Sequence, residues 1–222
     1  MIYLLLDEKK ENQITLKGEN FKYLIKVRRH SIDDTISIRY KADIKELCNY
    51  KIIFIDGRSV GLELISSEVV EVKSAKELHI AWCKIDIKSI EKVLPSLSEI
   101  GVAKISFISC DRSQNIKLDF KRFERILEAS MQQCGRSTYI EFDTYQNIEE
   151  FIVKYPDTKV FDFCENSLKD GSGFERVIIG AEGGFSQDEK ELLSSQEVFR
   201  LDTPMVLRSE SAVIAVASKV VL

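Results

Sequence analysis

The pattern of predicted secondary structure changes near residue 73, and this change limits the possible folds more than any other feature. Before it, short runs rich in β-branched and aromatic residues are separated by turn residues: MIYLLL, NQITL, TISIRY, KIIFID and VGLELI. One helical stretch, near Asn20 to Arg29, interrupts them. After residue 73, strands alternate with helices, which is typical of an α/β domain with a mainly parallel sheet. The sequence therefore predicts a small β-barrel over residues 1–72 and an α/β domain over residues 73–222.

Within the second region, the strands are expected at HIAWCK, AKISFIS, TYIEF, TKVFDF, RVIIGA and EVFRL. The first helix ends at Gly101, and the second has an apolar stripe from Phe120 to Cys134 with a basic outer face. A third helix is expected around Asn147 to Lys154. Ser186 and Glu189 have the capping-box spacing that begins a fourth, and an Ala/Val-rich helix runs from about Ser209.

Several classes of protein and of site are excluded by what the sequence lacks. No apolar run approaches the roughly 18–20 residues of a membrane span, and the first residues do not read as a signal or transit peptide, so we expect a soluble cytoplasmic protein. The five cysteines contain no CxxC pair, which argues against a disulfide frame or a zinc site, and we expect buried thiols. With only two histidines, most Ser-His-Asp arrangements lack their parts, and no metal is expected.

The charge is unevenly distributed. Residues 17–45 carry eight basic and four acidic side chains, and residues 104–136 carry seven and four, whereas residues 137–222 carry eight and sixteen. The two basic regions permit an anionic partner, although such runs are also typical of ordinary solvated faces.

One candidate ligand site is the stretch VIIGAEGGFS, residues 177–186. A buried strand there runs into a glycine-rich turn and a capped helix, at the strand end where open α/β sheets bind ligands. The spacing fits neither a Rossmann nor a P-loop motif. A tight turn that uses Gly183 and Gly184 only for positive φ explains the same residues.

A second candidate is the stretch LDTPMVLRSESA, residues 201–212. It brings Arg208 and Glu210 to the first turn of a very apolar helix. The two could be a reactive pair, or simply a helix-dipole carboxylate with its ion-pair partner.

Taken together and in this order, GAEGGFSQDE and LDTPMVLRSESA resemble the two C-terminal motifs of the bacterial 16S rRNA (uridine-N3) methyltransferases, a branch of the knotted (SPOUT) S-adenosylmethionine-dependent RNA methyltransferases. Three further stretches agree with the family in order: KVRR at 26–29, EIGV at 99–102 and QCGR at 133–136. The chain departs from the family pattern at Ser96, Tyr139, Ala181, Asp202 and Ser211.

The resemblance implies a PUA-like RNA-binding barrel, an α/β domain with a deep trefoil knot, and a homodimer that acts on 16S rRNA, within the small ribosomal subunit, as substrate. It implies S-adenosylmethionine as cofactor, bound largely by backbone. By position in the motifs, the expected cofactor-binding residues are Gly180, Glu182, Gly183, Gly184, Leu201, Met205, Val206, Leu207, Ser209 and Ala212, with Glu165 in the loop after TKVFDF.

The chemistry of uridine N3 assigns provisional roles to two side chains. Methylation needs loss of the imide proton and stabilisation of charge on the O2/O4 edge of the base, which must be unpaired. Arg208, a permanent cation, can polarise the uracil carbonyls. Glu210 can take the proton or orient the base, or it can merely hold Arg208 or cap its helix.

The basic residues of the two positive regions are the candidate RNA contacts, and their effect should depend on salt: Lys22, Lys26, Arg28, Arg29, Arg39, Arg112 and Arg136. Arg112 and Arg136 could instead pair with Asp111 or Glu128 on the surface.

Three other functions remain compatible with the sequence. A knotted methyltransferase could modify another RNA atom, such as a ribose 2'-hydroxyl, or a non-catalytic assembly factor could merely bind rRNA. A nucleotide-binding module is a third, but it lacks the expected lysine and metal-binding acids.

Overall fold

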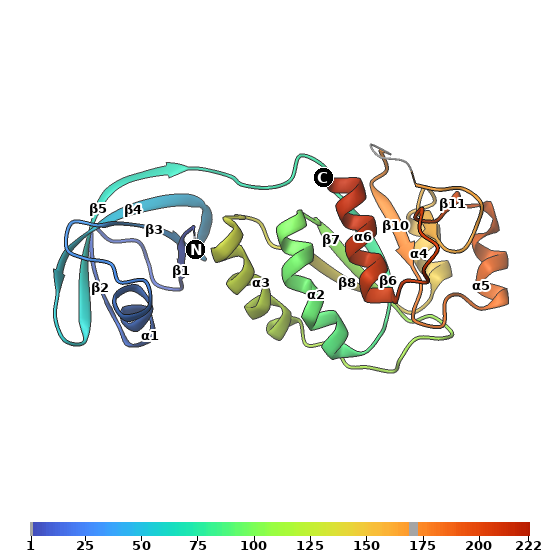
Figure 1. Cartoon of the computed structure of the whole chain (residues 1–222), viewed down its shortest axis with the longest axis horizontal. Helices are drawn as coiled ribbons and strands as arrows, with labels where there is room; N and C mark the ends of the chain where they lie inside the picture. Colours follow the sequence, from blue (N-terminus) through green and yellow to red (C-terminus); the bar gives the residue numbers. More distant parts are fainter. Residues whose placement is uncertain (1, 169–172) are drawn as a thin grey trace. The chain divides into compact units, whose positions relative to one another are not determined.

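The computed structural model describes residues 2–168 and 173–222. The chain forms two compact units (Figure 1), and one of them is discontinuous in sequence. The first unit contains Met1–Val72 together with Met131–Thr138, and the second contains Lys73–Ser130 together with Tyr139–Leu222.

The first unit is built on a five-stranded sheet with the order β1-β3-β4-β5-β2. Its strands are β1 (Leu4–Leu6), β2 (Gln13–Lys17), β3 (Thr35–Tyr40), β4 (Asp43–Ile55) and β5 (Ser59–Val69). β1 pairs with β3 in parallel, and the other pairs are antiparallel. Register shifts in the β3–β4 and β4–β5 ladders fit the curling of this sheet around its apolar core.

The helical stretch of this unit has two parts. A single α-turn, α1 (Gly18–Phe21), continues directly into a π-helix, η1 (Lys22–Val27). Phe21 and Leu24 are buried from it into the core of the sheet, which explains why an apolar pattern of helical type appears among the strands.

The second unit contains a six-stranded, entirely parallel sheet, which confirms the predicted α/β class. Its order is β11-β9-β10-β6-β7-β8. The strands are β6 (His79–Cys83), β7 (Lys104–Ile108), β8 (Glu141–Tyr145), β9 (Lys159–Phe161), β10 (Arg176–Ile179) and β11 (Val198–Phe199). Every residue of β6 is buried, as expected for a central strand covered on both faces.

The helices of this unit are α2 (Ile87–Ile100), α3 (Phe120–Cys134) up to Ser130, α4 (Ile148–Lys154), α5 (Gln187–Leu192) and α6 (Ser209–Val221), with a 3-10 turn, η2 (Leu193–Ser195), after α5. α2 and α6 pack against each other, and Figure 1 shows them side by side. The predicted end of α2 is confirmed, because Gly101 caps it at φ +104°. The predicted capping box of α5 is also present, between Ser186 and Glu189.

Two local expectations need correction. The strand predicted at TYIEF, residues 138–142, lies at Glu141–Tyr145 instead. The reason is that the preceding segment bonds elsewhere: the Ser137 amide donates to the Val72 carbonyl, 2.9 Å, and the ladder with β7 begins only at Glu141. The segment Met131–Thr138, expected to belong to the α/β domain, is part of the first unit.

No helix within the described residues is long and apolar enough to cross a membrane.

A polar network is buried at the amino end of the parallel sheet. His79, the first residue of β6, is 7% exposed and bonds through Nε2 to the Ser106 hydroxyl, 2.7 Å. That hydroxyl donates to the Asp143 carboxylate, which also pairs with Lys104 at 2.8 Å. Burial, reinforced by the charge of Lys104, lowers the pKa of His79 to about 4.

This network predicts that acid destabilises the fold through His79. An unfolded histidine binds a proton below about pH 6.5, whereas native His79 does so only near pH 4, so stability is lost between these values. The free energy of unfolding should fall by roughly 3 kcal/mol more in the wild type than in His79→Gln when the pH is lowered from 7 to 4. Urea denaturation at several pH values measures this, and equal pH slopes for the two proteins would contradict the assignment.

Candidate functional site

A cavity of about 250 Å³ lies at the carboxyl edge of the parallel sheet. Three segments enclose it: the end of β9, the glycine-rich turn after β10, and the loop from β11 to α6. Its walls are mostly apolar, and its lining is Phe161, Asp162, Phe163, Ile179, Gly180, Ala181, Glu182, Gly184, Phe185, Arg200, Leu201, Thr203, Pro204, Met205, Val206, Leu207, Ser209 and Ala212. The carboxyl ends of neighbouring parallel strands are where such sheets bind ligands.

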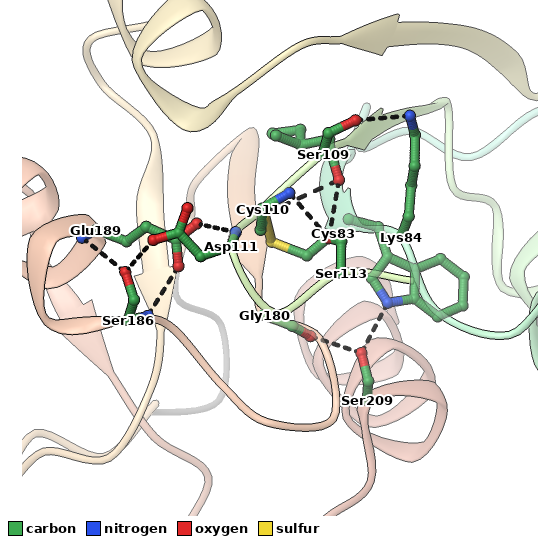
Figure 2. The surroundings of a disulfide bond; sticks show 12 residues. Cys83, Lys84, Ser109, Cys110, Asp111, Ser113, Gly180, Ser186, Glu189 and Ser209 are labelled. Atoms are coloured by element: carbon green, nitrogen blue, oxygen red, sulfur yellow. Dashed lines mark hydrogen bonds between the residues drawn. A yellow bond between two sulfur atoms is a disulfide. The ribbon is translucent and has the colours of Figure 1, made fainter. Parts of the chain in front are cut away.

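Ser209, the first residue of α6, connects three elements next to the cavity through hydrogen bonds. Its buried hydroxyl accepts a hydrogen bond from Trp82 Nε1, 2.8 Å, and donates one to the carbonyl of Gly180, 2.6 Å. Figure 2 shows this hydroxyl between α6 and the glycine-rich turn. One small side chain thus joins the central strand β6, the end of β10 and the start of α6.

Two positions of the turn require glycine for steric reasons. A Cβ at Gly180 would lie 3.3 Å from the Cα of Gly184, which is tighter than ordinary side-chain contacts. Gly184 itself has φ +68°, where other residues are strained. Its amide donates to the carbonyl of Ala181, 2.9 Å, and closes the turn.

A second loop holds the glycine-rich turn from outside the cavity. The Asp111 amide donates to Glu189 Oε1, 2.8 Å, and the Ser186 hydroxyl donates to Asp111 Oδ2, 2.5 Å. Figure 2 shows Asp111 facing both residues of the capping box. The neighbouring Arg112 donates to the carbonyl of Gly183, 2.5 Å. The loop after β7 therefore fixes both the turn and the start of α5.

A disulfide joins this loop to the central strand, contrary to the expectation from the cysteine spacing. Cys83 ends β6, and Cys110 follows the end of β7, so parallel pairing brings together two residues that are 27 apart in sequence (Figure 2). Of the remaining thiols, Cys48 is buried as expected, but Cys164 is half-buried and Cys134 exposed. Sequence spacing gave no sign of the pair because neither residue belongs to a local motif.

Most of the residues expected to bind the cofactor are brought together around the cavity: Gly180, Glu182, Gly184, Leu201, Met205, Val206, Leu207, Ser209 and Ala212. Gly183 and Glu165 are not part of the lining, and Glu165 is exposed. Sequence reasoning missed Phe161 to Phe163 and Arg200. The available signal was their position at the ends of two strands, since β9 pairs with both β10 and β11.

The two candidate catalytic residues flank Ser209 but do not line the cavity. Arg208 is exposed at the N-cap of α6, and its carbonyl accepts from the Ala212 amide, 2.8 Å. Glu210 is half-buried, and its Oε2 is buried without a hydrogen-bond partner.

Four of the candidate RNA contacts lie on one exposed segment of the first unit, formed by η1 and the turn after it: Lys22, Lys26, Arg28 and Arg29. Arg28 is held over the ring of Tyr23 and donates to its hydroxyl, 2.8 Å. Arg112 is also exposed, although it is engaged with Gly183.

The surface role expected for Arg39 and Arg136 is wrong, because both side chains are buried, at 2% and 6% exposure. Arg39 stacks on the ring of Tyr3 and donates to the carbonyls of residues 44 and 45, at 2.8 and 3.0 Å. Arg136 donates through Nε to the Thr138 hydroxyl, 3.1 Å, within the first unit. Burial lowers the pKa of both guanidinium groups. These arginines organise the first unit internally.

Among the described residues, no group of three or more His, Cys, Asp or Glu side chains is placed to hold a metal ion.

The chain is similar in sequence to a known protein family and to several of its members. Residues 72–221 match a family model described as an RNA methyltransferase domain. The chain is 37% identical over 214 residues to "Ribosomal RNA small subunit methyltransferase E" of Helicobacter pylori (strain ATCC 700392 / 26695), covering 94% of each chain. It is 27% identical to "Ribosomal RNA small subunit methyltransferase E 2" of Borreliella burgdorferi, over 87% of this chain and 84% of that one.

Two solved structures share the fold over nearly the whole chain. A Legionella pneumophila protein, solved in complex with the cofactor S-adenosylmethionine, has a TM-score of 0.75 at 21% identity and covers 98% of this chain and 95% of its own. Ribosomal RNA small subunit methyltransferase E from Neisseria gonorrhoeae, bound to S-adenosylmethionine, has a TM-score of 0.72 at 18% identity, with 98% and 96% covered.

The bridging role of Ser209 predicts a large effect of a small substitution. Ser209→Ala leaves the Trp82 indole and the Gly180 carbonyl buried without partners, and should lower the free energy of unfolding by at least about 2 kcal/mol. Ser211→Ala, at an exposed position of the same helix, is the matched control and should change it by less than about 0.5 kcal/mol. Denaturant unfolding compares the two, and equal effects would contradict the bridge.

The disulfide predicts a stability difference that depends on reductant. Closing a loop of this length is worth roughly 3 kcal/mol, so Cys110→Ser should lower the free energy of unfolding by about that amount without reductant. The effect should shrink strongly in dithiothreitol, where the wild type also loses the bond. Cys134→Ser, which removes an exposed free thiol, is the control. A full effect of Cys110→Ser in both buffers would assign its cause to packing instead.

Proposed function

The chain belongs to the RNA methyltransferase domain family and, within it, to the ribosomal RNA small subunit methyltransferases E, and from this premise we propose that it methylates N3 of a uridine in 16S rRNA with S-adenosylmethionine as methyl donor. One observation carries the proposal: the two C-terminal motifs, distant in sequence, line a single cavity at the carboxyl edge of the sheet. An apolar cavity at this position is the site that such a sheet offers to a small molecule.

The lining of the cavity fits S-adenosylmethionine. Phe161, Leu201 and Leu207 offer apolar surface to an adenosine. The carboxylate of Glu182 suits its positive charges. When bound, the cofactor supplies an electrophilic methyl group on a sulfonium.

Arg208 and Glu210 carry the proposed chemistry. The N-cap position of Arg208 puts a permanent cation beside the lining residue Ser209, where it can stabilise the negative charge that develops on the uracil carbonyls. Glu210 has a buried carboxylate oxygen without a partner, so it is available to take the N3 proton or to orient the base. The apolar walls exclude water from the methyl group.

The first unit supplies the proposed rRNA-binding surface. The segment formed by Lys22, Lys26, Arg28 and Arg29 is exposed and positively charged, as a phosphate-binding surface must be. We assign residues 1–72, which form this unit together with Met131–Thr138, to a PUA-like barrel, supported by the five curled strands, and the second unit to the methyltransferase domain.

A trefoil knot and a homodimer complete the proposal. The knot is supported by the path of the chain, which returns from β11 to α6 past the ends of β9 and β10. The dimer is supported by apolar side chains exposed at the rim of the cavity, where Phe163, Met205 and Val206 are 72%, 66% and 75% exposed. The small ribosomal subunit is the proposed substrate particle.

The proposal predicts methyl transfer that depends on Arg208. Unmodified small subunits and protein-free 16S rRNA are incubated with labelled S-adenosylmethionine, and the nucleosides are analysed. We expect the label in 3-methyluridine, with a rate reduced by roughly a hundredfold or more in Arg208→Ala, because one donor to developing charge is removed. Arg176→Ala, at the amino end of β10 and away from the cavity, is the matched control and should keep the rate.

Other outcomes identify the alternatives. Label in a 2'-O-methylated nucleoside would replace the N3 assignment, and cofactor binding without transfer to either RNA would favour an assembly factor. Normal turnover of Glu210→Gln, with substrate and cofactor binding intact, would remove the base role of Glu210.

A further inference from the structure

We propose that Arg200 binds the α-carboxylate of the cofactor, an inference that rests on the proposed function and deepens it. Arg200 follows β11 and lines the cavity. Its guanidinium Nε is buried without a hydrogen-bond partner. Within the part of the chain that the structure describes, its side chain forms no hydrogen bond or ion pair.

A buried polar atom without a partner is costly, and a guanidinium that the protein leaves unpaired is open to an anion from outside the chain. The contrast with Arg39 is instructive, because that buried side chain donates to two backbone carbonyls and stacks on an aromatic ring. Nε of Arg39 is also buried without a partner, but its Nη1 bonds to the two backbone carbonyls. Arg200 has no such side-chain bond among the described residues, and it lines the cavity.

The backbone of Arg200 is held in place on both sides. Its amide donates to the carbonyl of Asn166 and its carbonyl accepts from the amide of Leu168, each at 2.8 Å, across a parallel bridge between Ser167 and Arg200. The backbone from which the side chain extends is therefore held in place without a ligand. A planar guanidinium is well suited to bind a carboxylate through two hydrogen bonds.

The charges around the cavity complement those of the cofactor. Among the described lining residues, Arg200 is the sole cation, and Asp162 and Glu182 are the acids. Asp162 is already paired with Lys190, 2.9 Å, so it does not neutralise Arg200. S-adenosylmethionine carries one anionic group, its α-carboxylate, beside the ammonium and the sulfonium. Arg200 is the lining residue that matches this anion.

The buried position of the donor distinguishes the cofactor from RNA as the source of the anion. Nε of Arg200 is inaccessible to solvent in a cavity with mostly apolar walls. A ligand enclosed in that cavity can present its carboxylate to the side chain of Arg200 that lines it. An rRNA phosphate, carried on a solvated backbone, suits the exposed arginines of the first unit instead.

The test compares two ligands that differ by one group. Calorimetric titration gives the dissociation constants of S-adenosylmethionine and of decarboxylated S-adenosylmethionine for the wild type and for Arg200→Met, which keeps an apolar side chain but loses the charge. We expect Arg200→Met to weaken binding of S-adenosylmethionine by about tenfold or more and to leave the decarboxylated ligand unchanged, because a charge-assisted bond is lost with the first ligand alone. Arg58→Met, an exposed arginine of the first unit, is the control and should bind both ligands as the wild type does.

Each remaining outcome overturns a different statement. If the wild type fails to bind S-adenosylmethionine, the proposed function fails and the inference with it. If the wild type binds it and Arg200→Met weakens both ligands equally, or neither, the carboxylate assignment alone is wrong. Unchanged cofactor binding with weaker binding of a 16S rRNA fragment would assign the anion to a phosphate. Thermal unfolding of each variant without ligand identifies any effect that comes from misfolding.

Discussion

The hydroxyl of Ser209 is the point on which the arrangement of the cavity depends. It accepts from the indole of the central strand β6 and donates to the carbonyl at the end of β10, so the amino end of α6 is positioned by two buried hydrogen bonds. Because both partners lie in the interior, neither can exchange its bond for one with water. The loop from β11 is in turn confined between the strand ends and this helix. The start of α6 is therefore held rigidly beside the three segments that enclose the cavity.

The rest of the site shows where the fold leaves polar groups unsatisfied. Around the cavity, backbone and side chains are tightly paired in the capping box, in the Asp111 loop and in the glycine-rich turn. In contrast, Nε of Arg200 and Oε2 of Glu210 are buried without partners. A folded chain tolerates few such groups, and beside a cavity a bound molecule can complete their bonding. The polar atoms without hydrogen-bond partners are thus as informative about the site as those that have them.

The sequence allowed the class of fold and much of the cavity lining to be predicted. It did not allow prediction of features that depend on which residues are buried. The periodicity of residues 90–100 and the glycine at 101 predicted α2 and its end, because these signals are local. The two C-terminal motifs predicted half of the lining through their resemblance to a known family. Arg39 was misjudged because β3 buries consecutive residues near its end, so that simple alternation does not apply. The Cys83–Cys110 bond and the lining role of Arg200 depend on which strands are neighbours, and strand order is a long-range property.

The discontinuous first unit has a consequence for how the protein is made. The Tyr3 hydroxyl donates to the carbonyl of Arg136, 2.6 Å, and the Val72 amide donates to the Ser137 hydroxyl, 2.7 Å. During synthesis on the ribosome, the amino-terminal strands emerge long before these partners exist. The unit can therefore reach its final state only after more than half of the chain has been translated, and a fragment that stops at Val72 lacks the segment that completes it.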